Sequence, residues 1–163
     1  MRQSVDLPAV LALGSNLGDR GALLEAAITD IAAIPGVTLL KRSSIIETPA
    51  LKPDGIDFDA PPYLNAVVTI RTTLMPQQLL DAVNAIEADH GRVRVERWGD
   101  RTLDIDIITI GPMQVHTDTL TVPHPRAHER DFVLRPWLEV EPNAVLPGYG
   151  RVDELLARIG STA

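Results

Sequence analysis

Two aspartates spaced by one residue, Asp104 and Asp106, are the side chains whose types and spacing most clearly suggest chemistry. They alternate with Leu103, Ile105 and Ile107, which is the period of two expected of a β-strand with one apolar face. The two carboxylates would then lie about 7 Å apart on the opposite face, near enough to share a cation or a pair of cations. Aspartate is rare in strands and hard oxygen ligands suit Mg²⁺, so the pair predicts a magnesium site.

Four arginines precede this strand: Arg92, Arg94, Arg97 and Arg101. Arginines beside magnesium ligands can neutralise the negative charge of phosphate oxygens, so the stretch is typical of phosphoryl transfer. The same residues could instead form an ion-pair network on the sheet surface, because exposed Asp–Arg pairs are common and weak. The spacing by itself leaves both interpretations open.

The composition limits the class of protein. The chain has 163 residues, a formal net charge of −7 and no cysteine. Its length predicts a single domain over residues 1–163. The negative charge argues against a general nucleic-acid partner, and the lack of cysteine excludes disulfides, thiolate nucleophiles and Cys-based zinc sites. With neither a membrane-length apolar run nor a signal-peptide pattern, we expect a cytoplasmic protein with no membrane partner.

The elements that would position these residues follow the order β-α-β-β-α-β. The strands are predicted near residues 8–13, 37–47, 63–72 and 103–108, and the helices near 24–34 and 76–90, with two shorter helices near 134–138 and 152–159 in a C-terminal extension. This order predicts an α+β, ferredoxin-like fold, in which an antiparallel sheet carries both main helices on one face. Asp104 and Asp106 would lie on the face that these helices leave open.

Three other stretches each allow two interpretations. Residues 14–19 form either a well-made turn between strand and helix or part of a site, and they match no standard nucleotide loop. Tyr63, beside Asn65, is either a packing residue or a flat platform for a ligand. The His- and Arg-rich residues 123–132 are either a solvated turn or a phosphate-contacting segment. Residues 48–62, with four prolines, are expected to be a long irregular loop.

Several short motifs occur in order along nearly the whole chain: residues 11–19 (LALGSNLGD), 63–66 (YLNA), 91–94 (GRVR), 97–99 (RWG), 101–106 (RTLDID) and 122–125 (VPHP). Together they closely resemble the 6-hydroxymethyl-7,8-dihydropterin pyrophosphokinases of folate biosynthesis. The stretch from Arg-Trp-Gly to Asp-x-Asp is the most specific part of the resemblance.

The resemblance implies an enzyme that moves the β,γ-pyrophosphoryl group of ATP to the hydroxymethyl group of the pterin and leaves AMP. Asp104 and Asp106 match the aspartates that hold two Mg²⁺ ions in this family. Arg92 and Arg101 match arginines on a mobile loop that closes over the phosphates. The implied partners are the two small-molecule substrates, and we expect a monomer.

The resemblance also implies the binding residues. Tyr63 and Phe132 match the aromatic residues that sandwich the pterin ring, and Asn65, Thr48 and the Leu51 backbone match its hydrogen-bond partners. The nucleotide-side positions are Asn84, Glu87, Arg94, Arg97, Trp98, Ile107, Thr121, His124 and Arg130.

Two other classes of protein share part of the pattern. A palm-like nucleotidyl transferase also combines a ferredoxin-like sheet with two aspartates, but it would need a basic groove for nucleic acid, which the charge of −7 disfavours. A sheet-face RNA-binding module would need exposed aromatic residues where this chain has carboxylates. Formation of AMP from ATP only when the pterin is present would separate the three possibilities.

Overall fold

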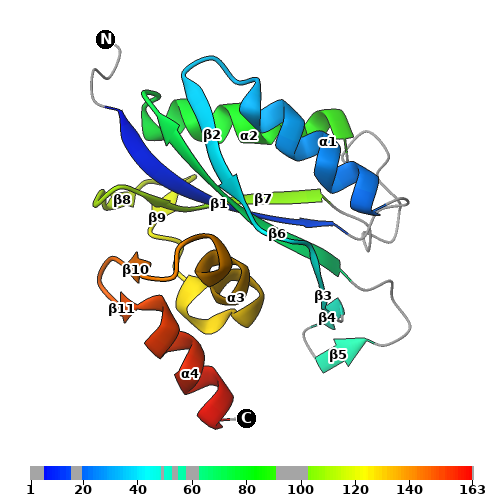
Figure 1. The fold of residues 1–163 in the computed structure, drawn as a ribbon. Coiled ribbons are helices and arrows are strands. Elements are labelled where there is room, and N and C mark those ends of the chain that lie inside the picture. Colours follow the sequence, from blue (N-terminus) through cyan, green and yellow to red (C-terminus); the bar gives the residue numbers. More distant parts are fainter. Residues whose placement is uncertain are drawn as a thin grey trace.

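The central sheet of the computed structural model has the strand order β2-β6-β1-β7 (Figure 1), and the short strand β3 also pairs with β6. The structure describes residues 6–15, 20–48, 50–52, 55–57, 63–90 and 103–162. The sheet strands are β1 (Leu7–Ser15), β2 (Val37–Arg42), β3 (Ile46–Thr48), β6 (Tyr63–Thr72) and β7 (Leu103–Ile110), and every pairing between them is antiparallel. Helix α1 (Arg20–Ala32) follows β1, and α2 (Pro76–His90) follows β6. The ferredoxin-like α+β prediction is thus confirmed.

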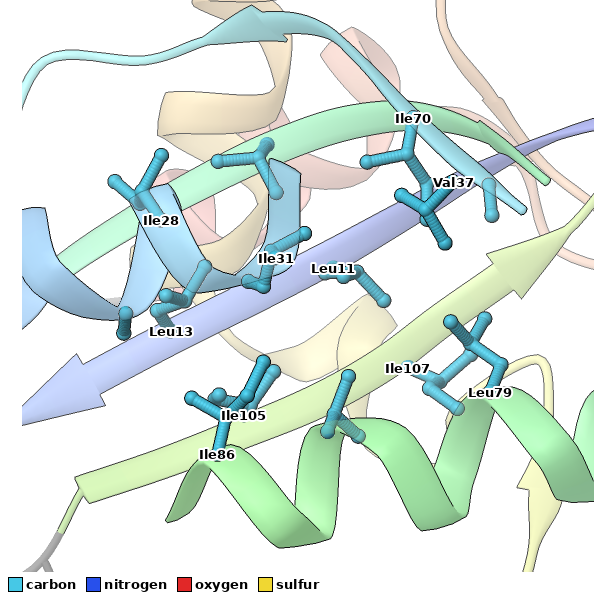
Figure 2. Close-up of a cluster of buried hydrophobic side chains, with 14 of the residues drawn as sticks. Leu11, Leu13, Ile28, Ile31, Val37, Ile70, Leu79, Ile86, Ile105 and Ile107 are labelled. Atoms are coloured by element: carbon cyan, nitrogen blue, oxygen red, sulfur yellow. The ribbon is translucent and has the colours of Figure 1, made fainter. Parts of the chain in front are cut away.

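The first hydrophobic core lies between the sheet and helices α1 and α2 (Figure 2). Leu11 and Leu13 of β1 and Ile105 and Ile107 of β7 point toward these helices. The helices contribute buried residues three or four positions apart, which puts them on one face of each helix: Leu24, Ala27, Ile28, Ile31, Leu79, Val83 and Ile86. The alternation seen in the sequence around Asp104 is therefore the alternation between this core and the opposite sheet face.

A second core covers part of that opposite face, beneath α3 (Asp131–Val140) and α4 (Val152–Thr162) (Figure 1). Its strand residues are Val10, Ala12, Val67 and Ile108, and its helix residues include Val133, Leu134, Trp137, Val140, Val152 and Leu155. The two main helices do leave this face open, as the sequence predicts. The C-terminal helices then cover one end of it, whereas Asp104 at the other end of β7 is exposed.

The second predicted strand is interrupted. The sequence predicts one strand over residues 37–47, but the structure has β2 and β3 separated by residues 43–45. Ser43 replaces the missing ladder contacts with β6, because its backbone N–H donates to the Val67 carbonyl at 2.8 Å and its hydroxyl accepts the Val67 N–H at 2.9 Å. Ser44 is held from the other side by Glu139 of α3, whose carboxylate accepts the Ser44 backbone N–H at 2.8 Å and the hydroxyl at 2.7 Å.

The prediction of an irregular loop over residues 48–62 is wrong in part. Strands β4 (Ala50–Lys52) and β5 (Gly55–Asp57) lie within it and pair antiparallel. Only Pro53 and Asp54 separate these strands in the sequence, a composition typical of a tight turn. Part of the stretch that its prolines suggested to be irregular therefore forms a pair of short strands.

The remaining elements build the region between β7 and α4. They are the paired strands β8 (Val115–His116) and β9 (Thr121–Val122), the 3-10 helix η2 (Ala127–Glu129), and the paired strands β10 (Val145–Leu146) and β11 (Gly150–Arg151). Both C-terminal helices predicted from the sequence are present and longer than predicted. Within the described part of the chain, no helix has the length and apolarity needed to cross a membrane.

Candidate active site

Asp104 and Asp106 lie on the same face of β7, at the end of the sheet that α3 and α4 leave uncovered. Asp104 is exposed, and the side chain of Asp106 retains 44% of its exposure. The register of the central strands places Gly14 of β1 between Asp104 on one side and Asn65 of β6 on the other. The two carboxylates therefore share an accessible sheet face with the polar start of β6.

Two basic side chains from the segment before α3 approach Asp106. The Arg130 Nη1 atom lies 3.8 Å from the Asp106 Oδ2 atom, and the His124 Nε2 atom lies 4.0 Å from the same oxygen. The backbone N–H of His124 donates to the Ile108 carbonyl at 2.9 Å, which ties this segment to the strand that carries the aspartates. Residues 123–132 thus bring positive charge to the carboxylates from a distant part of the chain.

The surroundings of His124 lower its pKa, which favours the neutral ring. Burial lowers the pKa of His124, and the positive charges of Arg130 and Arg126 act in the same direction against the opposing effect of the Asp106 carboxylate. The Nδ1 atom accepts the backbone N–H of Arg126 at 3.1 Å, so in the neutral ring the proton is on Nε2, the nitrogen that faces Asp106. A neutral imidazole of this tautomer can donate a hydrogen bond into the site.

The residues expected to hold the pterin gather at the start of β6. Thr48 of β3 is the register partner of Tyr63, and the Asn65 Nδ2 atom donates to the Thr48 hydroxyl at 2.8 Å. Asn65 is buried, whereas Tyr63 is half-buried. Phe132 is half-buried in the first turn of α3, with the guanidinium carbon of Arg130 5.6 Å from the centre of its ring. Because α3 packs against β6 and β3, Phe132 is on the same side of the sheet as Asn65.

The residues expected to bind the nucleotide are spread over more elements than those expected to bind the pterin. Asn84 is exposed on α2, and Thr121 is half-buried in β9. The side chain of Ile107 belongs to the first core, so it faces away from the aspartates. The Glu87 carboxylate accepts the backbone N–H of Ile105 at 2.7 Å, which caps an open hydrogen-bonding position of edge strand β7.

Other expected site residues lie outside the described part of the chain: Arg92, Arg94, Arg97, Trp98 and Arg101. Leu51 is in β4, so its backbone belongs to the hairpin that follows Thr48.

The chemistry of Asp104 and Asp106 suits the magnesium ion that the sequence predicts here. Among the residues that the structure describes, no group of three or more His, Cys, Asp or Glu side chains could enclose a metal ion. Asp104 and Asp106 instead offer oxygen ligands on an open face. Mg²⁺ is commonly held by one or two carboxylates together with substrate phosphates, which is the ligand set this face could provide.

Sequence reasoning missed two residues here. Arg126 fixes the His124 tautomer through its backbone N–H, a role that no sequence pattern signals. Gly14 was assigned to a turn, but β1 continues through Ser15 and places this glycine inside the sheet. A glycine directly after a continuous apolar run was the available signal, because glycine is unfavourable in a strand without a local reason.

The fold and the site define an α+β protein with two aspartates on an open sheet face beside basic groups. Comparison with known families identifies it further. Residues 10–142 match the model of 7,8-dihydro-6-hydroxymethylpterin-pyrophosphokinase. This chain belongs to that family.

Curated relatives agree with this assignment. The chain is 44% identical over 151 residues to a 2-amino-4-hydroxy-6-hydroxymethyldihydropteridine pyrophosphokinase of Methylorubrum extorquens, covering 93% of this chain and 92% of the relative. It is 40% identical over 150 residues to the enzyme of the same name from Haemophilus influenzae, covering 92% and 91%. The corresponding Bacillus subtilis protein is 44% identical over 132 residues, covering 81% and 77%.

Solved structures share the fold. Plasmodium falciparum HPPK-DHPS with pterin and p-hydroxybenzoate has a TM-score of 0.71 to this chain at 14% identity. The alignment covers 97% of this chain but only 44% of that one, so this chain spans less than half of the Plasmodium protein. At this identity the likeness concerns the fold alone.

Proposed function

We propose that this chain carries out its family's reaction on the sheet face that bears Asp104 and Asp106. Family membership makes it an ATP-dependent pyrophosphokinase of folate biosynthesis that acts on 6-hydroxymethyl-7,8-dihydropterin. The observation that carries the site assignment is the joint placement of two accessible carboxylates, with Arg130 and His124 close to Asp106 and Asn65 across β1.

Asp104 and Asp106 would hold two Mg²⁺ ions together with the phosphates of ATP. Bound there, these ions would neutralise phosphate charge and align the triphosphate. Arg130, within 3.8 Å of Asp106, is near enough to bind a phosphate oxygen beside the same carboxylate. His124, neutral with its proton on Nε2, would donate a hydrogen bond without adding charge.

The pterin would occupy the region of Tyr63, Asn65 and Thr48, with Phe132 as its second aromatic wall. A flat polar heterocycle is best held by aromatic faces and a few edge hydrogen bonds, which these side chains can supply. The Leu51 backbone, in the hairpin after Thr48, is included in this assignment. The pterin alcohol oxygen would then bond to the β-phosphorus of ATP as AMP leaves, a step that depends on alignment and charge neutralisation.

The nucleotide would extend from the aspartates along β7 and the neighbouring segments. The assignment includes Asn84, Glu87, Thr121, His124 and Arg130, together with Arg94, Arg97 and Trp98 before β7. Ile107 would contribute through its backbone, since its side chain is only 4% exposed. The proposal keeps Arg92 and Arg101 as the residues that stabilise the transferring phosphoryl group. We also propose a cytoplasmic monomer, and the absence of cysteine is compatible with a reducing compartment.

The test is AMP production by the purified protein with ATP and Mg²⁺, with and without 6-hydroxymethyl-7,8-dihydropterin. The proposal expects AMP and the pterin diphosphate in equal amounts, and only when the pterin is present. Chelation of Mg²⁺ should stop the reaction. AMP formation that is independent of the pterin would contradict the proposed function.

A further inference from the structure

Gly14 occupies a position where its backbone does not require glycine. It pairs with Asn65 on one side and Asp104 on the other, one residue before the end of central strand β1. Its φ angle is outside the left-handed region, unlike that of Gly36 and Gly111. Glycine in the interior of a strand is unfavourable, because it loses more conformational entropy on folding than any other residue. The reason for glycine here must therefore be space.

The space is occupied by the Asn65 side chain. A Cβ atom on residue 14 would stand 3.1 Å from the Asn65 Oδ1 atom and 3.6 Å from the Tyr63 Cδ2 atom. The other end of the same amide is already fixed, since Asn65 Nδ2 donates to the Thr48 hydroxyl at 2.8 Å. With Asn65 only 5% exposed, the amide has little room to move, and a side chain at residue 14 would push it by a few tenths of an ångström.

This displacement would change the distance between the two proposed substrate sites. Gly14 lies between the residues proposed to grip the pterin and the carboxylates proposed to hold the phosphates. Because β1 separates β6 from β7, the two groups lie about 10 Å apart across the sheet, two strand spacings. The pterin alcohol and the phosphate must meet above β1. A shift of the residues that bind the pterin therefore changes the distance between the alcohol oxygen and the β-phosphorus of ATP.

We infer that Gly14 is a positioning residue for the pterin: the missing side chain lets the Asn65 amide lie across β1, and the amide sets the position of the bound pterin relative to the aspartates. This inference rests on the proposed function. It assigns Gly14 no contact with ATP and no role in folding that alanine could not also serve.

The test is Gly14→Ala, with Gly21→Ala as the matched control, because a Cβ atom on Gly21 of α1 would meet nothing within 4 Å. We expect Gly14→Ala to weaken pterin binding and slow single-turnover AMP formation, each by about tenfold. Binding of a non-hydrolysable ATP analogue should be unchanged, and the protein should still fold, because the lower entropy of the unfolded alanine chain offsets part of the cost of the tight contact. Gly21→Ala should match the wild type in pterin binding, ATP-analogue binding and turnover, and its melting temperature should stay the same or rise, because alanine is favoured over glycine in a helix.

A double-mutant cycle with Asn65→Ala isolates the mechanism. Once the amide is removed, Gly14→Ala should cause no further loss of pterin affinity, and this comparison holds even if Gly14→Ala alone is less stable. Normal pterin binding and turnover in Gly14→Ala would overturn the inference, as would an additive loss in the double mutant or an equal loss of ATP-analogue binding. A wild-type protein without pterin-dependent AMP formation would instead overturn the proposed function.

Discussion

At the residue scale, the site combines side chains that are exposed for ligands with side chains whose orientation is already fixed. Asp104 and Asp106 face outward, whereas Asn65 is buried and bonded to Thr48. Fixed polar groups lose little entropy when a substrate binds, and exposed carboxylates can take up an ion without rearranging the core.

Asp104→Ala and Asp106→Ala should each nearly abolish turnover and leave the melting temperature close to that of the wild type. Neither carboxylate packs in a core, so the loss should be of metal and phosphate binding. The measurements are AMP formation over a Mg²⁺ titration and thermal unfolding. Asp118→Ala, an exposed aspartate between β8 and β9, is the control with normal activity expected. Near-normal turnover of either variant at limiting Mg²⁺ would refute the metal assignment.

Phe132→Ala should weaken pterin binding by about 1–3 kcal/mol, the range expected for the loss of a stacked aromatic partner. ATP affinity should change little. Because Phe132 also packs against the second core, some loss of stability is expected too. Phe132→Leu is the control, because it keeps most of the apolar volume but removes the aromatic ring. It should weaken pterin binding without a matching loss of stability. Equal losses of pterin and ATP binding would indicate a purely structural role.

At the element scale, the strand that carries the aspartates is an edge strand held from two sides. It pairs with β1, and Glu87 of α2 accepts the Ile105 N–H that lies between the two aspartates in sequence. On the other side of the site, α3 is tied to the β2–β3 connection by Glu139 and Ser44. These contacts join to the sheet the elements that carry the proposed metal ligands and the proposed aromatic contact Phe132.

Arg92→Ala and Arg101→Ala test the connection between α2 and β7. If these arginines engage the phosphates only in the transition state, each substitution should slow the chemical step by about 10²-fold and change substrate affinities far less. Single-turnover kinetics beside equilibrium binding would make the distinction. A tenfold loss of ATP binding with a normal single-turnover rate would make them nucleotide anchors instead.

Glu139→Gln tests the tie between α3 and the β2–β3 connection. Hydrogen bonds from the Ser44 hydroxyl and backbone lower the pKa of Glu139. A carboxyl whose pKa is lower in the folded state contributes stability above its unfolded pKa, and this contribution is lost as the pH falls through the folded pKa. The substitution should lower the free energy of unfolding at neutral pH, by less than about 1 kcal/mol because the group is exposed.

Urea unfolding at neutral pH and below about pH 4 would check the Glu139→Gln prediction. The difference in free energy of unfolding between the variant and the wild type should shrink in acid. Ser44→Ala removes the hydroxyl donor but keeps the backbone N–H donor, so it should reduce the same pH-dependent difference in stability without abolishing it. A difference that is constant with pH would exclude a contribution from the Glu139 charge.

At the scale of the whole molecule, one sheet lies between two layers of helices (Figure 1). A hydrophobic core fills the space between the sheet and each layer. Leu11 and Leu13 of β1 face the first core, whereas Val10 and Ala12 face the second. Because the same strands line both cores, neither layer of helices can lose its packing without exposing the sheet. A single cooperative domain over residues 1–163 is therefore the expectation from the structure as well as from the length.

Leu79→Ala in the first core and Leu134→Ala in the second should each cost about 2–5 kcal/mol, because both side chains are 0% exposed. Each variant should still unfold in a single transition, at a lower temperature or denaturant concentration than the wild type, and every method should give the same midpoint. Calorimetry and denaturant unfolding followed by circular dichroism and tryptophan fluorescence would check this. Two separate transitions in either variant would contradict the single-domain prediction.

By itself the sequence determined the type and the order of the main strands and helices, because these depend on the pattern of neighbouring residues. The period of two around Asp104, the helical spacing from Leu24 to Ile31 and the strand at Tyr63–Thr72 are all properties of neighbouring residues, and they correctly predicted the order of elements. Local pattern could not predict the β4–β5 hairpin, because the prolines around it suggest irregular structure equally well.

Only the tertiary structure decided which distant residues meet. The approach of Arg130 and His124 to Asp106, the covering of one end of the sheet face by α3 and α4, and the position of Gly14 between Asn65 and Asp104 all depend on strand order and register. Strand order and register are set by long-range pairing and by the burial of both sheet faces, and the sequence spacing of the residues concerned does not reveal them.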